Sequence, residues 1–317
     1  MTMKVLITGG AGFIGSHLAA FLQGRSEVRI LDNLRGGNRC SLKCLNLEMI
    51  EASVLDTDAL RAAVSGVDVV FHLAAMISAK ESMENPRECV EINTLGTLNV
   101  LRAAADAGVR KLVFASSAAV YGDDPAVPTV ETATPKPKSP YAISKLDGEY
   151  YCEMFAREGW LNTASLRFFN VFGPGQNPAG PYAAAVPAFM RLAVRGEPVT
   201  IFGDGEQSRD FVYMKDAVSG LVFAAQKSEV TGVFNCGYGH QTTVNELIRR
   251  ILASVGSRSP VVYLPERPGD VRHSCASTKK FCDSGWRPVS SLDDGLRETL
   301  EGFRQSAREA SASIWSA

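Results

Sequence analysis

The chain has 317 residues, of which 45% are hydrophobic and 21% are charged, a composition typical of a globular protein. Its 33 basic and 34 acidic side chains give a net charge of −1. This balance excludes the strongly basic field that draws proteins to nucleic acids or to anionic lipids. At about 150 residues per domain, the length predicts two domains, or one domain with an added lobe.

We expect a cytoplasmic protein without a membrane anchor or a metal centre. No apolar run approaches the about 18 residues of a membrane span, and the N-terminal run reaches glycine too early for a signal peptide. Seven scattered cysteines are typical of reduced thiols. Cys40 and Cys44 form the one close pair in the sequence, and no second pair or histidine cluster accompanies them, so no zinc site is predicted.

The first half of the sequence alternates between short apolar runs and longer helical patterns. The apolar runs predict strands at 5–8, 28–31, 47–51, 67–73, 111–116 and 163–168. Helices are predicted at 13–22, 57–64, 86–107 and 141–158, and the third is bounded by Pro86 and Gly108. Strands this apolar have both faces covered. The alternation therefore predicts an α/β fold with a parallel, doubly wound sheet and right-handed crossovers.

The pattern changes after residue 170. Gly173, Pro174 and Gly175 begin a stretch that is rich in glycine and proline and has no sustained periodicity. Shorter strands are predicted beyond it at 199–202, 211–213, 233–236 and 261–264, with helices at 215–226 and 243–254. We expect a domain over 1–170 and a smaller α+β lobe over 171–317, with segments near 212–236 returning to the first sheet. Residues 306–317 are rich in Ser and Ala and are expected to form a fraying tail.

A glycine-rich loop lies between the first predicted strand and the first predicted helix. Gly9, Gly12 and Gly15 follow the spacing G-x-x-G-x-x-G. Glycines at these positions permit a tight turn, let the backbone approach a pyrophosphate and let the helix pack closely on the strand. The amide N–H groups at the helix start, from Phe13 and Ile14, then face the anion. The loop therefore predicts a dinucleotide site.

Two acids that follow later strands indicate how the adenosine part is bound. Asp32 ends the second strand, 17 residues after Gly15. A carboxylate there accepts hydrogen bonds from the ribose hydroxyls and repels a 2′-phosphate, which favours NAD over NADP, although Arg35 lies nearby. Asp56 follows the third strand, where it either binds the adenine amino group or caps the next helix. The sequence leaves both roles for Asp56 open.

Tyr141 and Lys145 are the candidate reacting groups. They lie one helical turn apart at the start of the helix after the fifth strand, where the carboxyl ends of the strands face a cofactor. A phenol with a pKa near 10 is a poor base at neutral pH, but a neighbouring cation and the positive nicotinamide favour the phenolate. Lys145 also holds the nicotinamide ribose. Ser117, at the end of the fifth strand, is expected to bond the sugar oxygen that loses its proton, and Ser116 is its structural neighbour.

Several runs together carry a resemblance to a known family. They are T-G-G-A-G-F-I-G at 8–15, L-D-N-L at 31–34, H-L-A-A at 72–75, the serine pair, Y-x-x-x-K at 141–145, R-F-F-N-V-F-G-P-G-Q at 167–176, G-D-G-E-Q-S-R-D-F at 203–211 and R-P-G-D at 267–270. Over about residues 3–285 the chain resembles the extended short-chain dehydrogenase/reductases. Within them it is most similar to nucleotide-sugar 4-epimerases of the UDP-glucose/UDP-N-acetylglucosamine type. The resemblance implies a Rossmann domain with tightly bound NAD, a lobe that binds the nucleotide sugar, and a homodimer paired through helices.

The resemblance also assigns roles to individual residues. Arg209 and Arg267 would contact the diphosphate, as suits guanidinium groups, Asp270 the uridine ribose, and Asn170 the phosphate–sugar region. His72 would lie near the cofactor but outside the chemistry. The full cofactor set implied is Gly9, Gly12, Phe13, Ile14, Gly15, Asp32, Asn33, Asp56, Leu73, Ala74, Asn93, Ser116, Tyr141 and Lys145, and Ser117 and Ser274 join the substrate set.

The resemblance implies a reaction in which Tyr141 deprotonates the sugar 4-hydroxyl while hydride passes from C4 to NAD. Similar dehydratases carry an Asp-Glu pair at the positions of Ala118 and Ala119, and decarboxylating relatives carry a glutamate at the latter. Methyl groups transfer no protons, so elimination is disfavoured and return of the hydride to the other face of the keto sugar is expected.

The identity of the sugar is predicted from two positions. Ser274 matches a position that gates the sugar's 2-substituent, where a tyrosine would exclude an N-acetyl group. We therefore expect UDP-glucose/UDP-galactose and the N-acetylated pair as substrates. Ala183, Ala184 and Ala185 replace an amide-bearing segment of some UDP-galactose epimerases, which leans toward the N-acetyl or uronic-acid branches. A UDP-glucuronate 4-epimerase and a nucleotide-sugar 4,6-dehydratase or reductase remain the alternatives.

Overall fold

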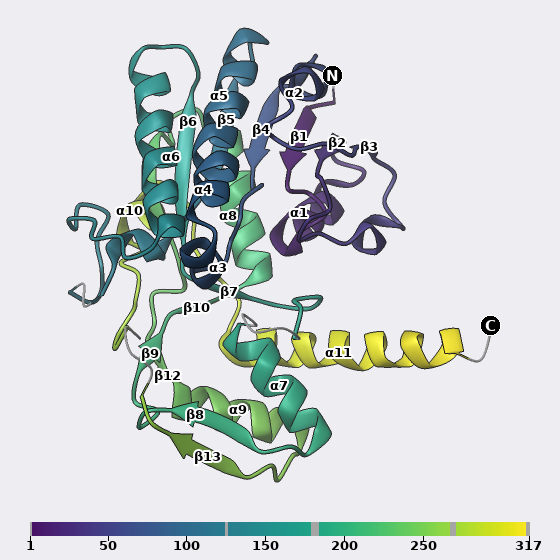
Figure 1. Ribbon diagram of the computed structural model, residues 1–317, viewed down its shortest axis with the longest axis vertical. Coiled ribbons are helices and arrows are strands. Elements are labelled where there is room, and N and C mark those ends of the chain that lie inside the picture. Colours follow the sequence, from purple (N-terminus) through teal and green to yellow (C-terminus); the bar gives the residue numbers. More distant parts are fainter. Residues whose placement is uncertain (1, 124–125, 179–183, 267–270, 315–317) are drawn as a thin grey trace.

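The centre of the molecule is a sheet of seven parallel strands in the order β11-β6-β5-β4-β1-β2-β3 (Figure 1). The computed structural model describes residues 2–123, 126–178, 184–266 and 271–314, the last with side chains to residue 305. The strands of the sheet are β1 (Lys4–Thr8), β2 (Glu27–Leu31), β3 (Glu48–Ile50), β4 (Val69–His72), β5 (Lys111–Ser117), β6 (Thr163–Phe168) and β11 (Gly232–Cys236). The predicted parallel, doubly wound sheet is confirmed.

Helices cover both faces of this sheet, because successive strand residues point to opposite sides. Val5 and Ile7 of β1 join a core that includes α1 (Phe13–Leu22) and α8 (Met214–Gln226). Leu6, between them, joins a second core with α2 (Thr57–Val64), α5 (Gly96–Asp106) and α6 (Pro140–Arg157). The central strands β4, β5 and β6 are thus buried on both faces, as predicted, whereas the edge strand β3 has no buried residue.

The predicted helix over 86–107 is helical throughout but not uniform. It begins with α4 (Pro86–Cys89), continues as a π-helical segment at Val90–Leu95, and ends as α5. A short helix that the sequence did not predict, α3 (Ala79–Glu84), precedes it. Wider turns of this kind are frequent at functional sites, and this one carries Asn93.

Within its described residues, the second half of the chain forms three small two-stranded sheets outside the main one. The pairs are β7 (Asn170–Phe172) with β10 (Phe211–Tyr213), β9 (Ser208–Arg209) with β12 (Thr242–Thr243), and β8 (Val199–Phe202) with β13 (Val261–Leu264). The helices α7 (Ala185–Arg195), α9 (Val244–Val255), α10 (Lys279–Asp283) and α11 (Leu292–Ile314) complete this part. In Figure 1, β8, β13, α7, α9 and α11 lie below the main sheet, whereas α10 lies beside it and contacts β11. β11 and α8 return to the main sheet.

The expected fraying tail from residue 306 is wrong, since α11 continues to Ile314. Leu296 and Leu300 of this helix are buried in the core and Phe303 packs against it. An amphipathic helix anchored in this way propagates through an alanine-rich segment, because alanine has the highest helix propensity. None of the described helices is long and apolar enough to cross a membrane.

Candidate active site

The glycine loop connects β1 to α1 and is packed too tightly for side chains at two of its positions. A Cβ atom on Gly9, whose φ is +71°, would lie 2.6 Å from the Ala74 backbone nitrogen, and one on Gly15 would lie 2.3 Å from the Gly9 carbonyl oxygen. Gly12 is the N-cap of α1 and offers no side-chain cap to the helix, whose first turn contains no acid. These uncapped amides fit an anion such as the pyrophosphate of NAD.

Asp32 joins the end of β2 to this loop. Its buried carboxylate accepts hydrogen bonds from the Ala11 amide at 2.9 Å and from the Leu34 amide at 2.7 Å. The guanidinium of Arg35 donates to Glu81 and Glu88, each at 3.0 Å. A 2′-phosphate of NADP would need an uncompensated cation, but the charge of Arg35 is already compensated by two carboxylates. This arrangement supports NAD over NADP.

The remaining predicted cofactor residues surround the same edge of the sheet. Asp56 caps α2, its Oδ1 accepting from the Asp58 and Ala59 amides at 3.1 and 2.9 Å, so the helix-cap alternative is observed. The Asn33 Oδ1 accepts from the Arg35 amide, and the Leu73 amide donates to the Thr8 carbonyl. The buried amide of Asn93 bonds both backbone groups of Met76 and the Ser144 hydroxyl, so it connects the π-helical segment to α6.

Tyr141, Lys145 and Ser117 lie together at the carboxyl end of β5. The Tyr141 and Ser117 hydroxyls are hydrogen-bonded to one another, and the Lys145 Nζ donates to the Ala115 carbonyl at 2.8 Å. The Lys145 Nζ is 5.9 Å from the centre of the Tyr141 ring. The backbone of Tyr141 is held by Ser82, whose Oγ accepts from the Tyr141 amide at 3.1 Å.

The titration of this pair differs from the sequence-based expectation. Burial raises the pKa of the Tyr141 phenol, and the bond to Ser117 opposes that shift in part. Burial also lowers the pKa of Lys145 to about 8. Without NAD, burial therefore keeps the Tyr141 phenol protonated, and the expected phenolate depends on the positive nicotinamide as well as on Lys145.

Ser116 and His72 lie beside the site and face away from its chemistry. Ser116 is buried and its hydroxyl donates to Glu149, on the opposite side of β5 from Ser117. His72 is hydrogen-bonded to Thr8 at 2.7 Å and to Thr97 at 2.9 Å. Burial lowers the pKa of His72 to about 3, so its imidazole is neutral at physiological pH and exchanges no proton there.

Apart from Ser117, the predicted substrate residues that the structure describes converge on residues 208–210. The Asn170 amide and its Nδ2 both donate to the Asp210 carbonyl, at 3.0 and 3.1 Å. The Ser274 amide donates to the Ser208 carbonyl at 3.1 Å, and Arg209 donates to the same oxygen at 2.9 Å. Arg267, Asp270 and Ala183 lie outside the described residues.

Sequence reasoning assigned no role to Asp210, although it lies within a quoted run. Its carboxylate is fully buried and accepts from the backbone amides of Tyr238, Gly239 and Ala276 at 2.8, 2.9 and 3.0 Å. Asp210 thereby binds two segments, at 238–239 and at 276, to its own segment beside Arg209. An acid directly after Arg209, between the short strands β9 and β10, was the available signal.

Three buried polar atoms in the second half of the chain have no hydrogen-bond partner among the described residues. They are Gln176 Oε1, Arg191 Nε and Gln207 Oε1. A buried polar group without a partner costs about 1–3 kcal/mol, and a hydrogen bond to water or to a polar ligand would remove this cost. Among the described residues, no group of three His, Cys, Asp or Glu side chains has the arrangement of a metal site.

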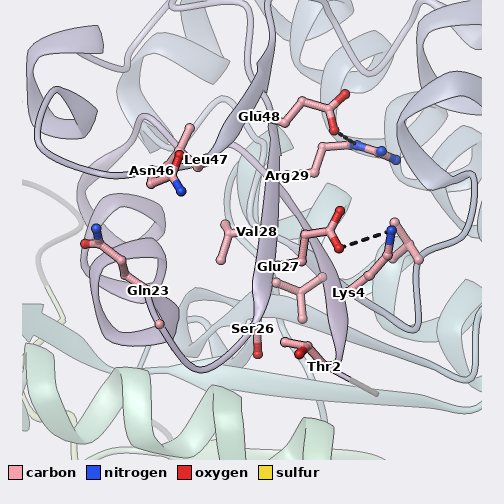
Figure 2. A pocket seen from close by; sticks show the side chains of 13 residues that line it. Thr2, Lys4, Gln23, Ser26, Glu27, Val28, Arg29, Asn46, Leu47 and Glu48 are labelled. Carbon is pink, nitrogen blue, oxygen red and sulfur yellow. Dashed lines mark hydrogen bonds and ion pairs between the residues drawn. The ribbon is translucent and has the colours of Figure 1, made fainter.

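A polar cavity at the other end of the sheet is separate from this site (Figure 2). It is lined by the starts of β1, β2 and β3, whereas the glycine loop follows the end of β1. Ion pairs between Lys4 and Glu27, at 3.1 Å, and between Arg29 and Glu48, at 2.6 Å, lie along its wall. Its charged groups are paired with each other, and we assign it no ligand.

Comparison with known proteins identifies the family. Residues 5–237 match the NAD dependent epimerase/dehydratase family. The chain is 37% identical to the solved UDP-N-acetylglucosamine 4-epimerase of Methanobrevibacter ruminantium, with a TM-score of 0.92 over 96% of this chain and 100% of that one. It is 40% identical to the solved UDP-glucose 4-epimerase of Thermotoga maritima, with a TM-score of 0.91 and the same coverage. It is also 36% identical to the UDP-N-acetyl-alpha-D-glucosaminuronate decarboxylase of Bacillus cytotoxicus, over 96% of this chain and 99% of that protein. The chain therefore belongs to the NAD dependent epimerase/dehydratase family, as an NAD-dependent epimerase.

Proposed function

We propose that the protein interconverts UDP-hexoses that differ in configuration at C4, through a transient 4-keto sugar. The observation that carries this proposal is the grouping of Tyr141, Ser117 and Lys145 at the end of β5, next to a loop and helix start that fit NAD. Both similar solved structures named above are 4-epimerases of UDP-sugars.

In this proposal each residue has a defined task. Bound NAD supplies a positive ring that accepts a hydride reversibly from C4 of the sugar. Tyr141, as phenolate, takes the proton of the 4-hydroxyl and returns it after the keto sugar has turned over. Ser117 orients that oxygen, and Lys145 holds the nicotinamide ribose and favours the phenolate. Gly12, Phe13 and Ile14 would bind the pyrophosphate.

The residues that follow Ser117 favour epimerisation over elimination. Ala118 and Ala119 begin a 3-10 turn that is capped by the Ser117 Oγ, which accepts from the Ala119 amide at 3.1 Å. The methyl groups of these alanines transfer no protons, so these two positions provide no second acid or base for elimination. Decarboxylation, the activity named for one relative, and 4,6-dehydration are the competing functions.

We propose that both the glucose/galactose and the N-acetylglucosamine/N-acetylgalactosamine pairs are substrates, with a uronic acid as the alternative. Ser274 is bonded through its backbone to Ser208, beside Arg209, and its small side chain leaves room for a 2-substituent. Ser274→Tyr is expected to abolish turnover of the N-acetylated sugar and to spare UDP-glucose. Equal loss on both sugars, or no loss on either, would remove Ser274 from this role.

The central test is proton NMR of the purified protein with UDP-glucose or UDP-N-acetylglucosamine. The proposal expects a C4 epimer at equilibrium and no net change in NAD, whereas an accumulating keto sugar or released CO2 would exclude it. Tyr141→Phe should lower kcat by about 10²- to 10⁴-fold with bound NAD retained. Tyr150→Phe, an exposed tyrosine on the same helix, is the matched control and should keep full activity.

We also infer a homodimer and a two-lobe organisation. The π-helical segment packs against α6, and the two expose Val90, Leu95 and Ile143, each nearly half accessible. Exposed apolar side chains on two helical segments that pack together are typical of an interface, which suits a second copy of the chain. Light scattering after size exclusion measures this oligomeric state. The proposed lobes, 1–170 for NAD and 171–317 mainly for the nucleotide sugar, are supported by the small sheets that only the second half forms.

A further inference from the structure

One face of α6 presents three functional groups to the end of β5. Tyr141, Lys145 and Glu149 are spaced four residues apart, so they lie along one side of the helix. Tyr141 bonds Ser117, Lys145 bonds the Ala115 carbonyl, and Glu149 accepts from the Ser116 hydroxyl. Three consecutive strand residues are therefore each bound by one side chain of α6.

Glu149 is also half of a buried ion pair. Its two carboxylate oxygens accept from the Nε and Nη2 of Arg167, on β6, at 2.9 and 2.7 Å. Both side chains are less than 5% exposed. Arg167 lies 4.7 Å from the Tyr121 ring centre and donates to the Glu131 carbonyl at 3.1 Å. A buried ion pair seldom adds net stability over an apolar pair of the same volume, so its presence behind the site calls for another explanation.

We propose that Glu149 is a positioning residue for the reaction. It fixes α6 against β5 through Ser116 so that the Tyr141 and Ser117 hydroxyls meet, and it keeps a negative charge beside Lys145. This inference rests on the roles proposed above for Tyr141 and Lys145.

The second task follows from the groups that face Lys145. They are Cys89 on α4, His72 on β4, and Tyr141, Glu149 and Cys152 on α6. Burial raises the pKa of both cysteines and of Tyr141, and lowers that of His72 to about 3, so these four are neutral at pH 7. Glu149, whose carboxylate is paired with the Arg167 guanidinium, is the remaining acidic group among them.

The charge on Glu149 raises the pKa of Lys145 and thereby affects how kcat depends on pH. Burial lowers the pKa of Lys145 to about 8, and Glu149 acts against that shift. Without the negative charge, the Lys145 pKa falls further and the cation is lost at lower pH. The alkaline limb of the kcat profile should then move to lower pH.

The test compares charge removal with charge retention. Glu149→Gln/Arg167→Met removes both charges and avoids an unpaired buried arginine. We expect this variant to retain NAD, to keep KM for the UDP-sugar within about twofold, and to lose kcat by about tenfold at pH 7. Its alkaline limb should move down by about half to one pH unit. Arg167→Lys keeps both charges and should keep the wild-type pH profile.

Two further variants keep the inference testable if the double variant does not fold. Glu149→Gln alone removes the negative charge and keeps the Arg167 cation, so the alkaline limb should move to lower pH, as in the double variant. Ser116→Ala removes one bond and no charge, so kcat should fall without a shift of the limb. A wild-type pH profile in both charge variants, or full kcat in Ser116→Ala, overturns the inference. Full activity of Tyr141→Phe would reject the proposed function itself. This outcome distinguishes a failure of the proposed function from a failure of the role proposed for Glu149.

Discussion

Gly12 and Gly15 belong to one motif but should fail for different reasons when replaced by alanine. A Cβ atom on Gly12 meets only the Gly9 carbonyl oxygen, at 3.2 Å, and the backbone there has φ −75° and ψ 178°, which any residue adopts. A Cβ atom on Gly15 would lie 2.3 Å from the same oxygen and 2.6 Å from the Gly10 Cα. Gly12→Ala should therefore weaken NAD binding, whereas Gly15→Ala should lower the stability of the protein.

The magnitudes follow from these contacts. At Gly12 the weaker N-cap propensity of alanine, up to about 1 kcal/mol, is offset by the reduced freedom of the unfolded chain, about 0.4–1 kcal/mol. The net change in unfolding free energy without NAD should be below about 1 kcal/mol. At Gly15 backbone atoms must move by about 1 Å, and overpacking of this kind costs about 1–3 kcal/mol. A methyl group between the Gly12 amide and the pyrophosphate should weaken NAD binding by about tenfold or more, or about 1.4 kcal/mol.

The assay measures NAD per chain after denaturing extraction, together with unfolding of the NAD-free protein by urea. Gly36→Ala is the control, because a Cβ atom there has no neighbour within 4 Å. Gly36→Ala and Gly12→Ala should be equally stable, and Gly15→Ala should be less stable than both. The NAD content should fall in Gly12→Ala and in Gly15→Ala. Full NAD occupancy in Gly12→Ala, or unchanged stability in Gly15→Ala, would refute the assignment of this loop.

Two further predictions concern groups at the edge of the site. The imidazole of His72 has a pKa of about 3 in the folded protein, against an ordinary value of 6.5. As the pH falls, the unfolded chain therefore takes up a proton on this residue at a higher pH than the folded protein does. The free energy of unfolding consequently falls as the pH drops from 6.5 toward 3. Between pH 7 and pH 5 the wild type should lose about 2 kcal/mol more than His72→Gln in urea unfolding, and equal losses would show that His72 is not buried neutral. Asp56→Ala should lose about 0.5–2 kcal/mol of stability through the α2 cap, which Asp56→Ser should largely restore. NAD binding that stays weak in Asp56→Ser would show an additional contact to adenine, whereas full recovery leaves the cap as its role.

The regular part of the fold was predictable because its signals are local. Every strand of the main sheet is an apolar run bounded by turn residues, and the observed limits differ from the predicted ones by at most two residues. Three helices outside the first half, α7, α10 and α11, were not predicted. α7 follows a stretch of glycine and proline, α10 has only five residues, and α11 lies in a segment whose Ser and Ala content suggested a tail.

Those parts of the site that a motif positions were predictable from the sequence. The roles and pKa values that depend on burial were not. The placement of Tyr141 beside Ser117 follows from the end of a strand and the start of a helix. Glu149 was missed because a lone acid eight residues after Tyr141 resembles a solvated helix residue in the sequence. The raised pKa of Tyr141 was missed for the same reason, since desolvation depends on how closely the surrounding chain packs and no spacing reports it.

The return of β11 and α8 to the main sheet limits what the N-terminal segment does alone. A fragment ending at residue 170 would lack an edge strand and the helix that packs against α1, so it would expose apolar core to solvent. Such a fragment should aggregate instead of folding as an independent cofactor carrier. The chain thus crosses repeatedly between the two proposed lobes. These crossings would tether the lobes at several points, permit small adjustments around a ligand and oppose wide opening.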